Sequence, residues 1–240
     1  MTLIIRLFFL FLVAIVLTFF SCSAQIDGVF RDGGSADLAI RTSLEPRTIA
    51  LIRTLRNFMG EAADAPILDG PAISLSMEAA PGIRSVSLIN TGPYALEGTI
   101  SISNVEDFLA NGGAKDRFIT YNEGLGTGFS SIVIALDRDS APELISRLSP
   151  EFEQYLSALM APVVLGDAST RQEYLDLLAS VYGRSLAAEI AAARIMAQIE
   201  FPRTVTALQG GTATGKLAEF DIPLLDILVL EQPLRYEVNW

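Results

Sequence analysis

The sequence predicts an α+β fold with a largely antiparallel sheet that is built from both ends of the chain. Two observations lead to this fold class. Segments rich in Ile, Val, Ser and Thr, with apolar residues at alternate positions, occur on both sides of the chain's middle, and such alternation is typical of half-buried strands. Between them, from about residue 140 to 200, apolar residues recur at helical spacing, so we expect central helices that pack on one face of the sheet.

The chain up to residue 136 contains six predicted strands, and those from residue 72 onward form a meander with short connections, which favours antiparallel pairing. The predicted strands are residues 36–42, 72–78, 83–90, 95–103, 117–121 and 129–136. Thr91-Gly92-Pro93 lies between the third and the fourth and predicts a hairpin turn.

Two helices are predicted among these strands. Pro46 suits a first helical turn, and the helix that it opens has one apolar face. That face carries Ile49, Ile52, Leu55 and Met59. Asn104 is expected to cap a short helix over residues 105–110, which ends at Asn111-Gly112-Gly113.

Helix starts in the central region are marked by capping residues. Thr170 with Glu173 has the spacing of a capping box, as does Ser140 with Glu143. Ser149 is a further N-cap because Pro150 follows it. Gly183 is expected to divide the later part of this region into two helices.

The last forty residues return to strand patterns, at residues 203–208, 217–222 and 234–240. A few short strands are barely stable alone, so we expect them to pair into the same sheet as the strands between residues 72 and 136. The apolar run Ile222–Leu230 is expected to be a core element, with an exposed patch for lipid or a partner as the alternative.

The N-terminus has the layout of a secretory signal. Arg6 is the one charged residue before an uninterrupted apolar run, Leu7–Phe20. Fourteen helical residues span roughly 21 Å, less than the roughly 30 Å of a bilayer core. The run therefore fits a signal peptide, residues 1–21, better than a membrane span.

Phe19-Phe20-Ser21-Cys22 is similar to the lipidation box of bacterial lipoproteins, in the looser spirochaete-type form. The resemblance implies that Cys22 becomes the lipidated N-terminus, that the membrane is a partner through this lipid, and that the body lies in the cell envelope outside the cytoplasm. Two alternatives stay open. Cys22-Ser23-Ala24 also fits an ordinary signal peptidase, which would leave a soluble secreted protein, and the apolar run would otherwise remain as an uncleaved anchor.

Two segments are expected after the signal. Residues 22–35 are polar and rich in glycine, which predicts a flexible tether. Residues 36–240 are expected to form a single α+β domain.

Composition excludes several classes of function. Without Arg6, 16 basic residues face 28 acidic ones, so nucleic-acid binding is not expected. The chain has no histidine, and Cys22 is its only cysteine. Zinc binding and catalysis by Ser-His-Asp or Cys-His groups are therefore excluded, while a carboxylate site for Ca²⁺ stays open. We expect neither a metal site nor a cofactor.

Two glycine-rich motifs are interpreted as turns. Gly210–Lys216 has the spacing of a phosphate-binding loop, but Leu217 replaces the Ser or Thr that would hold Mg²⁺, so a hairpin is expected. Gly124, Gly126 and Gly128 lie between two predicted strands and indicate a loop.

Two pairs of carboxylates are the remaining candidates for catalysis of a hydrolytic reaction. They are Asp137 with Asp139, and Glu219 with Asp221, each pair two residues apart and so on one side of a strand.

A second resemblance concerns the C-terminal segment. Phe201-Pro-Arg-Thr-Val-Thr, Gly210, Gly215, Phe220-Asp-Ile-Pro and Tyr236–Trp240 resemble the final hairpin of LppM-like envelope lipoproteins. The resulting hypothesis is a non-enzymatic, membrane-tethered lipoprotein that binds a protein partner, a hydrophobic ligand or an envelope component. The alternative is a carboxylate-dependent hydrolase acting on envelope glycans.

Overall fold

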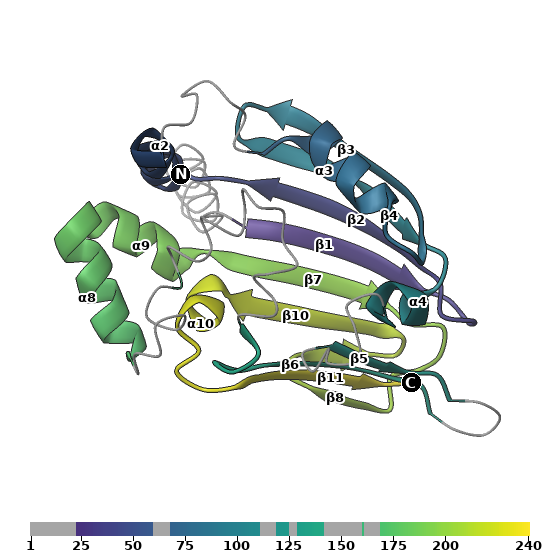
Figure 1. Cartoon of the computed structure of the whole chain (residues 1–240). Helices are drawn as coiled ribbons and strands as arrows, with labels where there is room; N and C mark the ends of the chain where they lie inside the picture. Colours follow the sequence, from purple (N-terminus) through teal and green to yellow (C-terminus); the bar gives the residue numbers. More distant parts are fainter. Residues whose placement is uncertain (1–22, 60–67, 111–118, 125–128, 142–159, 161–168) are drawn as a thin grey trace, which may run out of the picture.

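The body of the chain consists of two β-sheets and several helices (Figure 1). The structure is a computed structural model, and it describes residues 23–59, 68–110, 119–124, 129–141, 160 and 169–240. Both sheets combine strands from the two ends of the chain, as the sequence predicts. The predicted α+β class is therefore confirmed.

The larger sheet has seven strands in the order β3-β4-β2-β1-β7-β10-β9. Their bounds are β1 Ser23–Phe30, β2 Ala36–Ser43, β3 Ile83–Gly92, β4 Ala95–Ile102, β7 Arg194–Glu200, β9 Thr212–Thr214 and β10 Leu217–Pro223. Neighbouring strands are antiparallel, except that the central strands β1 and β7 run parallel. The sheet is thus largely antiparallel, with one parallel pair at its centre.

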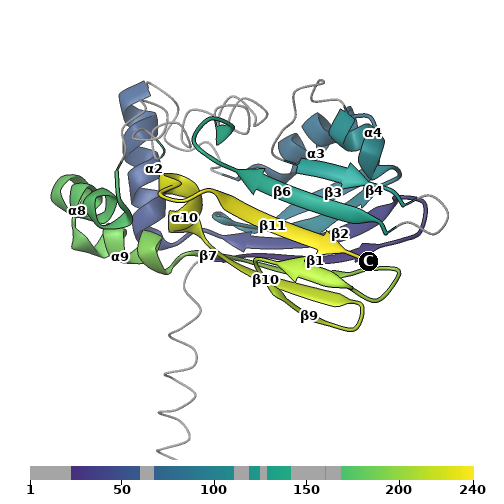
Figure 2. The ribbon, with the colours of Figure 1, turned by 90° about the horizontal axis from the view of Figure 1, so that it is seen from below.

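The smaller sheet has four antiparallel strands in the order β5-β6-β11-β8. Their bounds are β5 Ile119–Asn122, β6 Ser131–Leu136, β8 Ala207–Gln209 and β11 Leu234–Asn239. Figure 2 shows β6 and β11 lying across one face of the layer that contains β1, β2, β7 and β10. We call this face of the larger sheet its inner face and the opposite one its outer face.

The helices surround the two sheets. They are α2 Pro46–Met59, α3 Gly70–Glu78, α4 Val105–Ala110, α8 Arg171–Tyr182, α9 Arg184–Ala192 and α10 Leu224–Val229. Helix α3 packs on β3, while α8 and α9 form a hairpin at one end of the larger sheet, at the left in Figure 1. The two described helices of the central region, α8 and α9, thus lie at the end of the sheet more than over its face.

Local capping chemistry sets several helix ends where the sequence predicts them. The Thr170 hydroxyl accepts from the Glu173 amide at 3.2 Å, and the Glu173 carboxylate accepts from the Thr170 amide at 2.8 Å, which completes the capping box. Gly183 separates α8 from α9 at a φ of 93°. Asn104 caps α4, because its side-chain oxygen accepts from the amides of Glu106 and Asp107.

The prediction of a flexible tether over residues 22–35 is wrong for most of that segment. Ser23–Phe30 form β1, a central strand of the larger sheet, and a short turn leads from it into β2. Ile26, Gly28 and Phe30 alternate with the outward-facing Gln25, Asp27 and Val29, which is the strand signal that the glycine-rich composition concealed. The body therefore begins directly after Cys22.

The strand expected over residues 72–78 is wrong as well, because Gly70–Glu78 form helix α3. The Asp69 carboxylate caps it by accepting from the Ala72 amide at 3.0 Å, and Pro71 occupies the first turn. Ile73 and Met77 share one helical face and pack into the core beside β3 and β4.

The helical pattern expected up to residue 200 ends earlier, because residues 194–200 form β7. The strands after residue 200 divide between the sheets, with β9 and β10 in the larger and β8 and β11 in the smaller. The run Ile222–Leu230 is a core element, since Leu225, Leu228, Val229 and Leu230 are buried.

Some predictions fall outside the described residues. They concern Cys22, the end of α4 at 111–113, Glu143 and the cap at Ser149-Pro150. The expected apolar face of α2 is confirmed at Ile49 and Ile52, which are buried.

Candidate functional site

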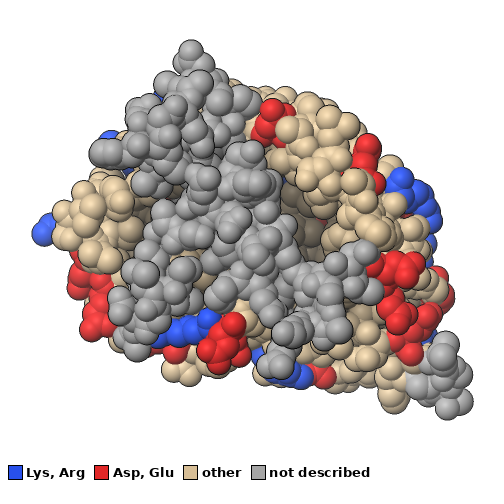
Figure 3. Space-filling view, in the orientation of Figure 1, with Lys and Arg blue, Asp and Glu red and all other residues tan. Residues whose placement is uncertain are grey.

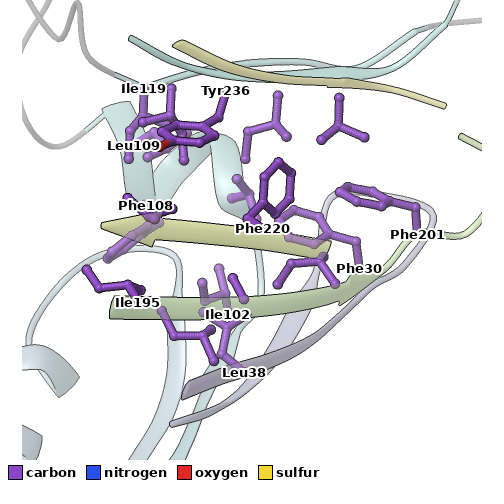
Figure 4. A pocket seen from close by; sticks show the side chains of 18 residues that line it. Phe30, Leu38, Ile102, Phe108, Leu109, Ile119, Ile195, Phe201, Phe220 and Tyr236 are labelled. Carbon is purple, nitrogen blue, oxygen red and sulfur yellow. The ribbon is translucent and has the colours of Figure 1, made fainter. Parts of the chain in front are cut away.

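An apolar cavity of about 280 Å³ lies between the inner face of the larger sheet and the smaller sheet. Strands β1, β2, β4, β7 and β10 contribute lining residues on one side, and β5, β6 and β11 contribute them on the other. Helix α4 adds Val105, Phe108 and Leu109. Figure 4 shows the labelled side chains converging from these elements on one space.

Strand alternation aims the apolar side chains at the cavity. On β7, Ile195, Ala197 and Ile199 line the cavity, and the residues between them lie on the outer face. On β10, Phe220 and Ile222 do the same. Because side chains alternate along a strand, β7 and β10 each have an apolar face toward the cavity and a largely polar outer face.

Small residues leave room at the centre of this wall. A Cβ on Gly28 of β1 would lie 2.6 Å from Ile199 Cδ1 and 2.8 Å from Leu38 Cδ2. The missing side chain thus lets the two neighbouring strands bring their side chains together over β1. Ala197 lies on β7 opposite Ile26 of β1 and also presents only a methyl group to the cavity.

A cluster of aromatic rings forms one end of the cavity. Phe30 stacks on Phe201 with ring centroids 5.4 Å apart, and Trp240 lies 4.5 Å from Phe201 and 6.1 Å from Phe30. Trp240 is buried, and its amide and carbonyl are both hydrogen-bonded to the backbone of Ser130. Figure 4 shows Phe30, Phe201 and Phe220 grouped at this end.

Most of the lining is only half-buried, although it faces the interior between the sheets. This holds for Phe30, Leu38, Phe108, Ile195 and Phe220, whereas a packed core would bury such residues fully. The cavity is thus partly open, and a molecule of suitable size has apolar surface to cover.

Tyr236 supplies the single polar side-chain atom among the 18 lining residues. Its ring meets Phe220 edge-on at 5.8 Å, and Figure 4 shows it beside Ile119 and Leu109. Burial, assisted by the charges of Asp226 and Asp221, raises the pKa of the phenol, so it stays protonated at neutral pH. No residue in the described part of the chain hydrogen-bonds to this hydroxyl.

The carboxylate pair on β10 lies on the outer face, away from the cavity. Glu219 and Asp221 share this face, as the alternation predicts. Each is engaged by a neighbour on β7: Glu219 accepts from Gln198 at 3.0 Å, and Asp221 lies 3.4 Å from Arg194. The pair is part of the exposed polar surface of the sheet.

The second carboxylate pair lies after β6. The Asp137 carboxylate accepts from both the amide and the hydroxyl of Ser140 at 2.8 Å. These bonds hold the pKa of Asp137 below its usual range, the hydroxyl contributing most, whereas a general acid needs a raised pKa. Neither Asp137 nor Asp139 lines the apolar cavity. Asp137 therefore stabilises a turn.

The remaining motifs have structural roles where they are described. Gly210–Lys216 belongs to the β9–β10 hairpin, with Gly215 at a φ of 62° in its turn, so the predicted hairpin is confirmed. Most of the loop between Gly124 and Gly128 lies outside the described residues. Over the described ranges, no cluster of acidic or cysteine side chains is arranged to hold a metal ion, and no helix is long and apolar enough to cross a membrane.

Sequence reasoning missed the cavity and its residues. Its signal was present in the alternation of Ile195, Ala197 and Ile199, which looked like the continuation of an alanine-rich helix. The cavity itself depends on how eight strands and one helix converge, and no local pattern records this.

No protein-family model matches the chain, and no curated protein matches it in sequence. Among solved structures, the fold is similar to the folded domain of the LppM protein of Mycobacterium tuberculosis. The two share 11% sequence identity at a TM-score of 0.42, over 91% of this chain and 88% of that one.

Proposed function

We propose that this chain is a membrane-anchored envelope domain that binds the hydrocarbon part of an amphipathic ligand, such as a lipid, between its two sheets. The observation that carries the proposal is the cavity of about 280 Å³, whose 18 lining residues present hydrocarbon everywhere except at Tyr236. Small-molecule sites are typically clefts of roughly 300–1,000 Å³ with apolar walls and few polar groups, and this cavity approaches that range.

The cost of leaving the cavity empty supports the proposal. At about 24 cal/mol per Å³, an unfilled void of 280 Å³ forfeits at most roughly 7 kcal/mol of packing. Domains are stable by only about 5–15 kcal/mol, so such a void would consume much of the margin. A bound hydrocarbon chain restores these contacts, whereas water finds almost no hydrogen-bonding partners in the cavity.

Filling the cavity tests the proposal. Ala197→Phe places a ring where the ligand would lie, and we expect it to weaken binding of a fluorescent fatty acid by at least about tenfold. The matched control is Ala39→Phe on β2, because Ala39 lies between Leu38 and Ile40 and thus faces the outer side of the sheet. Binding is measured by titration, with Trp240 fluorescence as a second signal because its ring contacts the aromatic end of the cavity.

Unchanged fatty-acid binding in a folded Ala197→Phe variant would contradict the proposal, as would equal losses in both variants. Thermal unfolding of each variant separates loss of the site from loss of the fold. If Ala197→Phe does not fold, Ile222→Phe fills the cavity from β10 in its place.

The hydroxyl of Tyr236 predicts that the ligand carries a hydrogen-bonding group where it meets this residue. We expect Tyr236→Phe to weaken binding of a fatty acid or a monoacyl ester by about 3- to 10-fold, since a neutral hydrogen bond contributes about 0.5–1.5 kcal/mol. Binding of an alkane of the same length should not change, because it offers no hydrogen-bonding group. Isothermal titration of the paired ligands measures the difference, and equal losses for both would show that the hydroxyl binds no ligand.

The hydrolase hypothesis gains no support from the described carboxylates. Neither Glu219 with Asp221 nor Asp137 with Asp139 lines the cavity. We therefore propose a binding role without a chemical step.

A further inference from the structure

The tip of the α8–α9 hairpin exposes large apolar side chains. Leu177, Val181 and Tyr182 are exposed to 51%, 60% and 46%. Leu177 and Val181 are four residues apart on α8 and so lie on one face, and Tyr182 adjoins them at the end of the helix. Gly183 follows at a φ of 93°, and nothing lies within 4 Å of the position that its Cβ would take. The described part of the chain thus leaves this turn uncovered.

The charge at this tip differs from that of the chain as a whole. The chain carries a net charge of −11, yet residues 177–188 contain a single charged side chain, the exposed Arg184. The acidic residues of α8 lie in its first half, where Glu173 closes the capping box and Asp176 accepts from Gln172. Figure 3 shows this end of the molecule, at the left, as a largely uncharged surface with basic atoms at its outer edge and acidic side chains below.

The hairpin lies at the end of the larger sheet where the described chain begins. Ser23, the first residue of β1, pairs with Arg194, the first residue of β7, and only Ala193 separates Arg194 from α9. Ser23, where the described chain begins, therefore lies beside the base of the hairpin. Because β1 begins directly after Cys22, no spacer lifts this end of the sheet away from a membrane that holds the N-terminus.

We propose that the tip of the α8–α9 hairpin, residues 177–184, inserts into the headgroup region of the bilayer that anchors the chain. This inference rests on the membrane attachment in the proposed function and holds for a lipid on Cys22 and for an uncleaved apolar segment. Leu177 and Val181 supply the apolar contact, Tyr182 has the amphipathic ring favoured at a membrane interface, and Arg184 faces the lipid phosphates. The acidic remainder of the body stays in water.

An environment-sensitive probe on the full-length protein tests this contact. Val181→Cys is labelled with NBD in protein reconstituted into vesicles of phosphatidylethanolamine and phosphatidylglycerol. We expect blue-shifted emission that spin-labelled phospholipids quench strongly. The matched control is Leu75→Cys on α3, an apolar helix residue that is 72% exposed and lies away from the hairpin. The unsubstituted chain, labelled in parallel, measures any reaction at Cys22.

Lipid quenching at residue 181 but not at residue 75 supports the inference. Water-exposed emission at both positions overturns it, as does blue-shifted emission at residue 181 that lipids do not quench, because the tip then contacts protein. Fatty-acid titration of the Ala197 and Ala39 variants is a separate measurement. If the membrane contact is disproved, the proposal that the cavity binds a ligand still stands. If ligand binding in the cavity is disproved, the proposed membrane contact still stands.

Discussion

Deleting residues 234–240 is expected to unfold the whole body of the protein. These residues form β11, which pairs with β6 on one side and β8 on the other, and end at Trp240. Val238 and Trp240 are 2% and 3% exposed and pack in one cluster with Phe201 and Ala218 of the larger sheet region. Removing a buried Trp alone typically costs about 3–5 kcal/mol, and domains have only about 5–15 kcal/mol to lose.

Thermal denaturation followed by circular dichroism measures this effect, because Trp240 is the only tryptophan and its fluorescence is lost with the deletion. We expect no cooperative transition in the truncated chain. The control is Arg235→Ala, because Arg235 is an exposed residue of the same strand whose side chain bonds only to Glu237 among the described residues. A truncated protein that still unfolds cooperatively within a few degrees of the full chain would show two independent domains.

Replacing Cys22 with Ala is expected to release the protein from the membrane and to abolish its labelling with palmitate. Cys22 is the only cysteine, so no other thiol can accept the lipid that we propose, and loss of an anchor with two or more acyl chains removes stable attachment. Membrane fractionation and metabolic labelling of the full-length variant measure both effects. The control is Ser21→Ala, which keeps a small residue before the cysteine.

The three N-terminal alternatives give different results in this experiment. Full palmitate labelling of the Cys22→Ala variant would rule out lipidation at this residue. Attachment that survives without labelling indicates that Leu7–Phe20 stays as an uncleaved anchor. An unsubstituted protein that is found free of membranes indicates cleavage by an ordinary signal peptidase.

Features fixed by contacts between near neighbours in sequence were predictable. The Thr170–Glu173 capping box, the Asn104 cap and the break at Gly183 each depend on groups within a few residues of one another. The β3–β4 hairpin belongs to the same class. The interactions that form these features are local, so they can be predicted from short stretches of sequence.

Features fixed by distant partners were not predictable in this way. β1 has the composition of a loop, and it becomes a strand because β2 and β7 supply hydrogen bonds on both sides. β7 continues an alanine-rich helical stretch, but Ile195, Ala197 and Ile199 all face the cavity once it joins the sheet. In α3 the reverse occurs, since the Asp69 cap and the apolar contacts of Ile73 override a strand-like alternation.

The cavity belongs to this second group. Its wall comes from both sheets and α4, and each segment alone resembles an ordinary core strand. Gly28 shows the difficulty, because in sequence it marks flexibility, whereas in the fold it lets Leu38 and Ile199 meet over β1.

The parallel pairing of β1 with β7 determines when the body can fold. Ser23 and Arg194 are the first residues of neighbouring strands, yet 170 of the chain's 240 residues lie between them. Pairs so far apart in sequence form slowly, because a long loop must close before any contact compensates for the lost entropy. β10, which pairs with the other edge of β7, comes later still. During synthesis from the N-terminus, β1 must therefore wait, unpaired on one side, until residues 194–200 of β7 have been made.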